Sequence, residues 1–292
     1  MSDRKFIGRQ ALRNALATRR RVSASKSQPV CVYDIAEELG VEVLFRPENS
    51  LDGMYVKTSR TILIPSNRPP GRQAFTCAHE LGHCLFGHGS RIDEIAVLEE
   101  EHAHDPEERL ANAFGGYLLM PPWAVKEAFF RRNWVPRSSK PLQVYIVAGQ
   151  LGVGYETLVR HLFHSLNMLS LTDMELLLRS TPKRLRRSLL GHDNSRHLIV
   201  VDRAWTKIAL DLQVGDFLIL PTGVNLEGGC ATIVGDHPLG TLGQAMLPGI
   251  ARVQDCDGSW ATFVRVSRRD FVGRSIYRHL EDPDVEHSPV DS

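Results

Sequence analysis

The sequence predicts an α+β protein in which a mainly helical part precedes a smaller β-rich part. Two observations lead to this fold class. Up to about residue 190 the chain shows helical periodicity with helix-ending glycines and prolines, interrupted by strand signals over residues 41–65. From His197 onward, short runs rich in Val, Ile and Leu alternate with Gly, Pro and Asp. A length of 292 residues allows about two domains and a full hydrophobic core.

The helical part is expected to contain several helices and one small group of strands. A helix over Val32–Leu39 should end at Gly40, because glycine readily adopts the left-handed conformation that closes many helices. Val41–Phe45 follows as a strand, and Gly53–Val56 with Thr61–Pro65 predicts a hairpin. The remaining expected helices are Phe6–Arg21, Arg72–Phe86, Pro106–Leu119, two within Leu142–Leu166 around a turn at residues 152–154, and the basic helix Pro182–Leu190.

The β-rich part contains five strand-like runs separated by turn residues. A polar stretch at residues 191–196 precedes them and is expected to be a domain linker. The expected strands are Leu198–Val201, Phe217–Leu220, Ala231–Val234, Ile250–Val253 and Ala261–Val266.

Composition excludes several classes of protein. With 42% hydrophobic and 24% charged residues, the chain resembles ordinary globular proteins rather than disordered ones. No apolar run approaches the roughly 20 residues that span a bilayer, and Met1–Arg21 lacks the apolar stretch of a secretory signal. Five scattered cysteines are too few for a disulfide framework. We therefore expect a cytoplasmic protein with no membrane partner.

One segment, His79-Glu80-Leu81-Gly82-His83, carries the residues for metal chemistry. Residues four apart lie on one helix face, so His79 and His83 can both bind one Zn²⁺. Glu80 is placed to act as general base toward a water at an open metal position. Such a pattern arises by chance roughly 0.03 times in a chain of this length and composition. The segment therefore predicts a zinc-dependent hydrolase, most plainly a peptidase.

A catalytic zinc needs a third protein ligand, and the acidic region after residue 100 supplies the candidates. Glu108 begins the helix expected over residues 106–119, and Asn112 lies one turn further on the same face. The residues alone leave the choice open among His102, His104, Asp105, Glu107 and Glu108.

Three more potential ligands lie close to the two histidines. Cys77 is expected on the apolar side of the helix, as a core residue. Cys84 is displaced from the metal-binding face, and His88 follows Gly87 and should lie outside the helix.

Two blocks of the sequence resemble the ImmA/IrrE family of zinc metallo-endopeptidases. Phe75 to His83 (FTCAHELGH) is similar to the first family motif. Glu108 to Pro121 is similar to the second, although Ala111–Phe114 stand one residue later than expected and Gly115-Gly116 replace the usual alanines. The resemblance covers roughly residues 30–165.

This resemblance implies a zincin-like metallopeptidase core, Zn²⁺ as the cofactor, and His79, His83 and Glu108 as its ligands with Glu80 as the catalytic residue. It also implies cleavage of a helix-turn-helix transcriptional repressor in a stress, DNA-damage or mobile-element response. The expected organisation is a basic helical extension (1–30), the zinc peptidase core (31–140), a helical subdomain similar to helix-turn-helix (141–192), a β-rich regulatory domain (193–280) and a tail (281–292).

Weaker signals concern nucleic acid. The turn at residues 152–154 is typical of a helix-turn-helix, but only Arg160 and His161 offer polar groups to a DNA groove, so packing against the core is the alternative. A basic cluster, defined here as Arg179, Lys183, Arg184, Arg186 and Arg187, together with the +7 charge of residues 1–30, is compatible with a single-stranded DNA effector. The alternative for the basic cluster and for residues 1–30 is an ordinary solvent-exposed surface that binds no nucleic acid.

Three further hypotheses concern the site and its identity. Thr61–Pro65 is expected to be a free strand edge that binds substrate, with Tyr55 helping to hold the oxyanion. Cys230 offers a thiolate that would block the zinc, against the alternative of an inert cysteine. The alternative function is a DNA-binding transcription regulator with a structural metal site.

Overall fold

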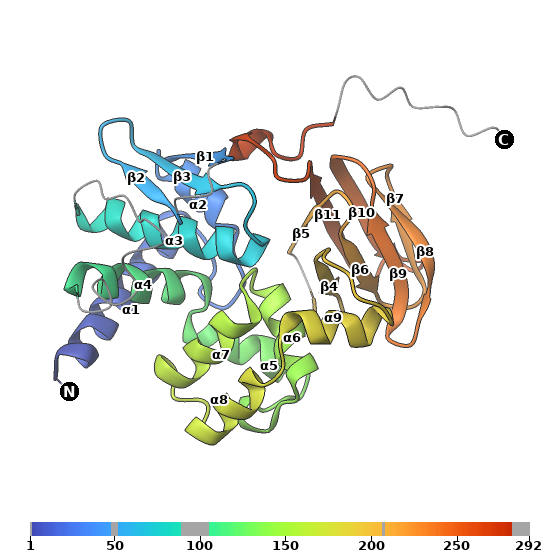
Figure 1. Ribbon diagram of the computed structural model, residues 1–292, viewed down its shortest axis with the longest axis horizontal. Coiled ribbons are helices and arrows are strands. Elements are labelled where there is room, and N and C mark those ends of the chain that lie inside the picture. The colour runs from blue at the N-terminus through green and yellow to red at the C-terminus, as the bar shows by residue number, and fades with distance from the viewer. Residues whose placement is uncertain (1, 48–51, 89–104, 206–207, 282–292) are drawn as a thin grey trace.

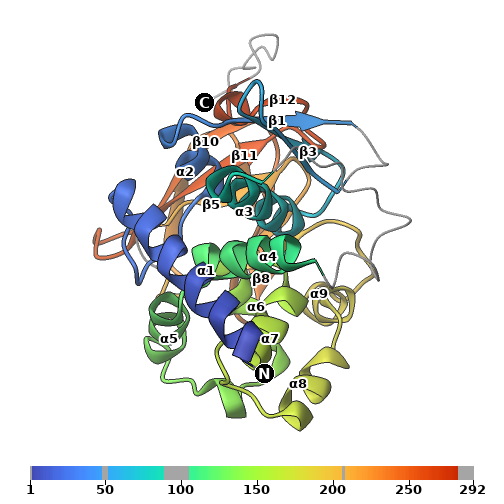
Figure 2. The ribbon, with the colours of Figure 1, turned by 90° about the vertical axis from the view of Figure 1, so that its left-hand side faces the viewer.

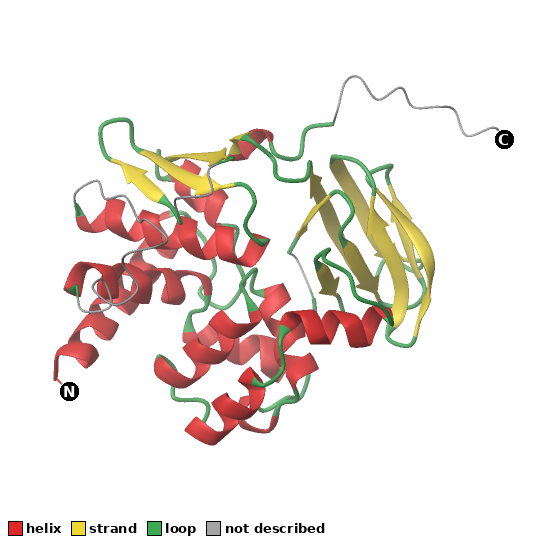
Figure 3. Ribbon diagram, in the orientation of Figure 1, coloured by secondary structure: helices red, strands yellow, loops and turns green. Residues whose placement is uncertain are grey.

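The computed structural model describes residues 2–47, 52–88, 105–205 and 208–281. It combines helices and strands in an α+β arrangement. Helices and one small sheet occupy one side of the molecule, and two further sheets occupy the opposite side (Figures 1 and 3). No helix of the described residues is long and apolar enough to cross a membrane.

A small mixed sheet and the helices beneath it form the N-terminal layer. The strands run in the order β12-β1-β3-β2. β1 is parallel to β3, and β2 is antiparallel to β3, as expected for the hairpin. The elements of this layer are α1 (Ser2–Arg21), α2 (Val32–Glu38), β1 (Glu42–Arg46), β2 (Met54–Val56), β3 (Thr61–Pro65), α3 (Pro70–Phe86) and α4 (Pro106–Leu119).

The pairing of β3 contradicts one expectation from the sequence. β3 lies between β1 and β2, so Thr61–Pro65 is an interior strand and not a free edge. Ile62 and Ile64 are fully buried. The sequence shows the hairpin but not the parallel pairing with β1, which joins residues about 20 positions apart. The outermost strand on this side is β2.

The basic helix α1 packs along α4 and shares its hydrophobic core through Ile7, Ala11 and Ala15 (Figure 2). Arg19 on this helix is fully buried, and its guanidinium donates to the carbonyl oxygens of Leu118 and Gln28, each at 2.8 Å. A buried guanidinium is stable only when its donors are satisfied. Helix α1 therefore joins the core, and the positive charge of Arg19 is not available to an external ligand.

A helical group follows, comprising α5 (Pro122–Phe130), the 3₁₀ turn Pro136–Ser138, α6 (Pro141–Gln150), α7 (Tyr155–His164), α8 (Leu171–Leu178) and α9 (Pro182–Leu190). The helix-turn-helix candidate lies in α6 and α7. His161 is buried, with its Nε2 2.9 Å from the carbonyl oxygen of Met120. Arg160 pairs with Glu156 on the same helix. α7 therefore packs against the core, which was the alternative to a DNA-binding helix.

The C-terminal strands form two four-stranded sheets with the orders β5-β11-β10-β7 and β4-β6-β9-β8. They enclose a separate hydrophobic cluster that includes Trp205, Leu218, Val253 and Val264. The strands are β4 (Leu198–Val200), β5 (Leu210–Gln213), β6 (Phe217–Leu220), β7 (Val224–Glu227), β8 (Ala231–His237), β9 (Gly240–Ala245), β10 (Gly249–Asp255) and β11 (Ala261–Ser267).

After β11 the chain returns to the N-terminal layer. β12 (Gly273–Arg274) pairs with β1, and Phe271 packs edge-on against Phe45 at a ring separation of 6.1 Å. Arg278 lies over the ring of Tyr33 at 5.0 Å. Phe271, β12 and Arg278 thus lie against β1 and α2 of the N-terminal layer.

Candidate metal centre

The site is built on two helices, α3 and α4, that approach each other closely. A Cβ atom at Gly82 would lie 3.2 Å from the Cα of Ala111, and one at Gly115 would lie 3.2 Å from the backbone nitrogen of His79. Contacts this short leave almost no room for a side chain. The two glycines therefore allow the helix that carries His79 and His83 to lie directly against the helix that carries Glu108.

Three polar side chains converge where these helices meet. The Nε2 atoms of His79 and His83 are 3.0 Å apart, and the carboxylate of Glu108 lies 3.2 Å from the first and 3.3 Å from the second. All three residues are buried, and their donor atoms lie within 4.8 Å of one another. The structure thus brings together the three residues that the resemblance implied as ligands.

The structure at the start of α4 distinguishes Glu108 from the neighbouring candidates for the third ligand. Asp105 is the N-cap of this helix, and its side chain accepts from the backbone N–H of Glu107 at 2.8 Å. Capping of this kind satisfies a helix N–H and leaves Asp105 outside the cluster. Glu107 is half-buried, whereas Glu108 is buried and faces α3. His102 and His104 lie outside the described residues.

Electrostatics and donor chemistry both suit a metal cation. Burial acts to raise the pKa of Glu108, but hydrogen bonds with His79 and His83 outweigh it and hold the pKa well below its usual range. The carboxyl is therefore ionised. Two imidazole nitrogens and one carboxylate match a donor set used by catalytic zinc sites, which keep a fourth position open. The residues present therefore fit a zinc ion.

Glu80 lies beside this cluster on α3 and is almost fully buried. The backbone of Gly53, just before β2, covers its side chain. A Cβ atom at Gly53 would lie 3.1 Å from Oε1 of Glu80 and 2.3 Å from Cγ2 of Thr76. Glycine is thus required here by close approach, and the backbone of Gly53 forms a wall beside Glu80.

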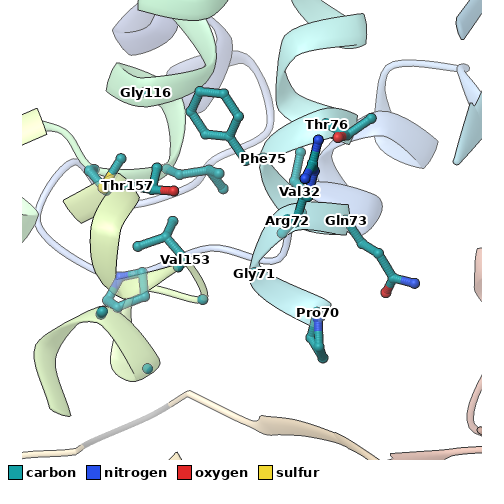
Figure 4. Close-up of a pocket in the computed structure, with 18 of the residues that line it drawn as sticks. Val32, Pro70, Gly71, Arg72, Gln73, Phe75, Thr76, Gly116, Val153 and Thr157 are labelled. Atoms are coloured by element: carbon teal, nitrogen blue, oxygen red, sulfur yellow. The ribbon is translucent and has the colours of Figure 1, made fainter. Parts of the chain in front are cut away.

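A large cleft of about 2070 Å³ reaches His79, Glu80 and Glu108. Figure 4 shows part of it, with Pro70, Gly71 and Arg72 of α3 on one side and Val153 and Thr157 on the other. The cleft also extends to residues of β5 and β11. Its size is sufficient for an extended polypeptide rather than only a small molecule.

The remaining residues near the histidines take different positions. Cys77 is fully buried in the hydrophobic core, as expected, and burial raises the pKa of its thiol well above its usual value. Burial and a hydrogen bond with Cys84 raise the pKa of Tyr55 to about 12. Tyr55 thus contacts the residue that follows His83, and its role as an oxyanion donor stays a prediction.

His88 lies closer to the metal-binding histidines than the sequence indicated. It lies outside α3, as expected, but its Nδ1 is 2.9 Å from Nδ1 of His83 and its side chain is buried. A glycine directly after a helix often reverses the chain toward the preceding turn. The pair Gly87-His88 was therefore a signal that His88 returns to the metal-binding face.

Two other candidates lie away from the cluster. Cys230 is buried among the C-terminal sheets, where burial raises the pKa of its thiol to about 11 and its sulfur faces the carbonyl oxygen of Val264. It does not block the site. In the basic cluster, Arg186 is half-buried and hydrogen-bonded to Tyr145, whereas the other four side chains are exposed.

Comparison with known proteins identifies a family over the part of the chain that carries these residues. Residues 36–163 match the IrrE N-terminal-like domain family. The chain is 35% identical over 94 residues to the radiation response metalloprotease IrrE of Deinococcus radiodurans, a match that covers 32% of this chain and 29% of that protein. It is 33% identical over 96 residues to IrrE of Deinococcus deserti, covering 32% of this chain and 34% of that protein.

The chain therefore spans about a third of the length of these curated relatives. Among solved structures, a Mycobacterium tuberculosis transcriptional regulator superposes with a TM-score of 0.36 and 16% identity, over 53% of this chain and 46% of that one. A superposition this weak carries no argument about function.

Proposed function

Residues 36–163 make this chain a member of the ImmA/IrrE family through its IrrE N-terminal-like domain, and on that premise we propose that it is a zinc-dependent endopeptidase. The observation that carries the proposal is the buried cluster of His79, His83 and Glu108, open to a cleft beside Glu80. These residues lie on α3 and α4, as in the zincin-like core that we propose for this domain.

In this proposal His79, His83 and Glu108 hold the zinc. When bound, zinc acts as a Lewis acid that polarises the scissile carbonyl and makes water a usable nucleophile near neutral pH. Glu80 accepts the proton of the attacking water and delivers it to the leaving amine. Its side chain lies on α3 beside the ligands, under the backbone of Gly53, and lines the cleft.

Substrate binding is proposed along β2. β2 is one of the two edge strands of the described N-terminal sheet, with β12 at the opposite edge, and Gly53 directly before β2 lies against Glu80. An extended peptide that pairs with this strand would pass the site with its side chains alternating between the two faces. Substrate peptides with single N-methylated amides should lose cleavage at alternate positions, and equal losses at all positions would contradict strand pairing.

The substrate class follows from the family resemblance, and we extend it to this chain as a proposal: a helix-turn-helix repressor, cleaved in the cytoplasm during a stress, DNA-damage or mobile-element response. The alternative, a DNA-binding regulator with a structural metal site, is less well supported. Its recognition helix would be α7, whose Leu158 and Leu162 are fully buried. A structural zinc would also need a fourth protein ligand.

Single-stranded DNA remains the proposed effector. Support comes from four exposed side chains of the basic cluster, Arg179, Lys183, Arg184 and Arg187, since counterion release favours such groups on phosphate. Cleavage of the repressor should respond to single-stranded DNA at low salt and less at physiological salt. An unchanged response after charge reversal at Arg184 and Arg187 would refute this surface as the effector site.

The proposed activity is tested by Glu80→Gln. This variant should retain zinc and fold but cleave the repressor about 10²–10⁴-fold more slowly, because a positioned general base is lost. The measurement is the cleavage rate of purified, zinc-loaded variant and wild type with equal metal content. Undiminished cleavage by the variant would contradict the proposed mechanism.

A further inference from the structure

The turn after α3 returns the chain to the candidate metal centre. Gly87 adopts a left-handed conformation with φ of 73°. Its N–H donates to the carbonyl of Cys84 at 3.3 Å, and the N–H of His88 donates to the carbonyl of His83 at 3.1 Å. These two bonds form a Schellman motif. They fix the backbone of His88 directly over the last turn of the helix that carries His83.

The ring of His88 is also held by aromatic packing. Phe86 stacks on it with a centroid separation of 5.6 Å and an interplanar angle of 29°. Phe86 in turn contacts Phe114 of α4 edge-on at 5.6 Å. Because the imidazole is buried in this stack, backbone and side chain together determine which atom of His88 faces His83.

The facing atoms are Nδ1 of both rings, 2.9 Å apart. The other nitrogen of His83, Nε2, points into the cluster with His79 and Glu108. A neutral imidazole that donates an electron pair through Nε2 carries its proton on Nδ1. That proton requires an acceptor, and Nδ1 of His88 lies at hydrogen-bonding distance.

We infer that His88 is a positioning residue that fixes the tautomer and ring orientation of His83 by accepting the hydrogen bond from its Nδ1–H. The inference rests on the proposed zinc site but concerns how that site is organised rather than whether it cleaves a peptide. His88 is no zinc ligand in this arrangement. Such outer hydrogen bonds to metal-binding histidines typically contribute about 10–100-fold in metal affinity.

Two substitutions separate the acceptor from the bulk of the ring. His88→Phe keeps an aromatic ring against Phe86 but removes the acceptor. His88→Asn loses the ring but can place an amide oxygen where Nδ1 stands. Zinc affinity of the full-length apo-protein, measured by competition with a chromogenic chelator, should fall about 10–100-fold in His88→Phe. In His88→Asn it should stay within about threefold of wild type.

Zinc affinity of His88→Phe equal to wild type would overturn the inference, and so would an equal loss in both variants. Thermal unfolding of the apo-proteins shows whether both variants fold. A second measurement needs no variant: ¹⁵N NMR of the zinc-loaded wild type should find His83 protonated at Nδ1 and His88 at Nε2. A proton on Nδ1 of His88 would contradict its role as acceptor.

This outcome is independent of catalysis. If Glu80→Gln cleaves as fast as wild type while His88→Phe loses zinc affinity, the proposed peptidase mechanism fails and the role of His88 stands. If Glu80→Gln is inactive while His88→Phe binds zinc normally, the proposed peptidase mechanism stands and the role of His88 fails.

Discussion

The helix pair α3–α4 and the two C-terminal sheets both bury polar side chains, but they do so differently. In the sheets, buried carboxylates such as Asp216 and Asp255 pair with an arginine. Asp216, for example, accepts from the backbone N–H groups of His197 and Gln213 and pairs with Arg269 at 2.9 Å. In the helix pair, His79, His83 and Glu108 instead direct their donor atoms to one common point.

This difference shows which buried polar groups indicate chemistry. A carboxylate whose acceptors are filled by backbone N–H groups and an arginine stabilises local structure. Three electron-pair donors that converge within 4.8 Å would repel one another without protons or a cation between them. Convergence, rather than burial alone, therefore distinguishes the candidate metal centre from the polar groups of the sheets.

The comparison predicts its largest effect for the converging residues. His79→Ala and Glu108→Ala should abolish stoichiometric zinc binding, because each removes one of the three protein ligands that a catalytic zinc requires. Metal analysis of the purified full-length proteins measures this. The matched control is Glu107→Ala, one residue away, which should keep one zinc per chain. Loss of zinc in Glu107→Ala with full zinc in Glu108→Ala would move the third ligand by one residue.

A smaller effect is expected at the wall of the site. Gly53→Ala should displace the carboxylate of Glu80, because the added Cβ would lie 2.3 Å from Cγ2 of Thr76 and 3.1 Å from Oε1 of Glu80, so the backbone at residue 53 and these side chains must shift. Misplacement by about 1 Å can cost ~10²-fold in rate, so we expect a loss of this order with zinc content unchanged. The matched control is Gly229→Ala, where a Cβ meets no atom within 4 Å. Equal activities for the two variants would show that Gly53 does not position Glu80.

In the sheets, substitution should affect stability and leave the metal centre unchanged. Asp216→Asn replaces an acceptor by an amide that cannot satisfy all three donors, which should lower the free energy of unfolding by about 1–3 kcal/mol. Urea denaturation measures this, with the exposed Asp236→Asn as control, expected within about 0.5 kcal/mol of wild type. Loss of zinc from folded Asp216→Asn would contradict the claim that polar groups of the sheets do not contribute to the metal centre.

The smallest effect is expected for Cys230→Ala. The thiol is buried among the sheets, so its loss should change the free energy of unfolding by about 1 kcal/mol and leave zinc content and cleavage rate unchanged. Higher activity in this variant would revive the blocking role that the sequence suggested.

Much of the N-terminal half could be predicted because its signals are local. Gly40, Gly87 and the two prolines at 121 and 122 mark helix ends, and α4 begins and ends where the sequence predicts. The motif around Glu80 is likewise contained in one helix, so its histidines are close wherever that helix lies. Periodicity over a single element is sufficient for such predictions.

What could not be predicted depends on contacts between distant segments. The sequence did not show that β3 pairs with β1, or that β12 returns from residue 273 to the N-terminal sheet. Strands β5, β7 and β9 were missed because their residues do not form continuous apolar runs; β7, for example, alternates half-buried and exposed residues. The choice of Glu108 over Glu107 likewise depends on which face of α4 meets α3.

The most direct test of the central claim is a crystal structure of the zinc-loaded full chain, with anomalous data at the zinc absorption edge. One anomalous peak is expected between Nε2 of His79, Nε2 of His83 and the carboxylate of Glu108, with a fourth position open to the cleft. A peak elsewhere, or a fourth protein ligand that closes the site, would contradict a catalytic zinc and favour a structural metal site.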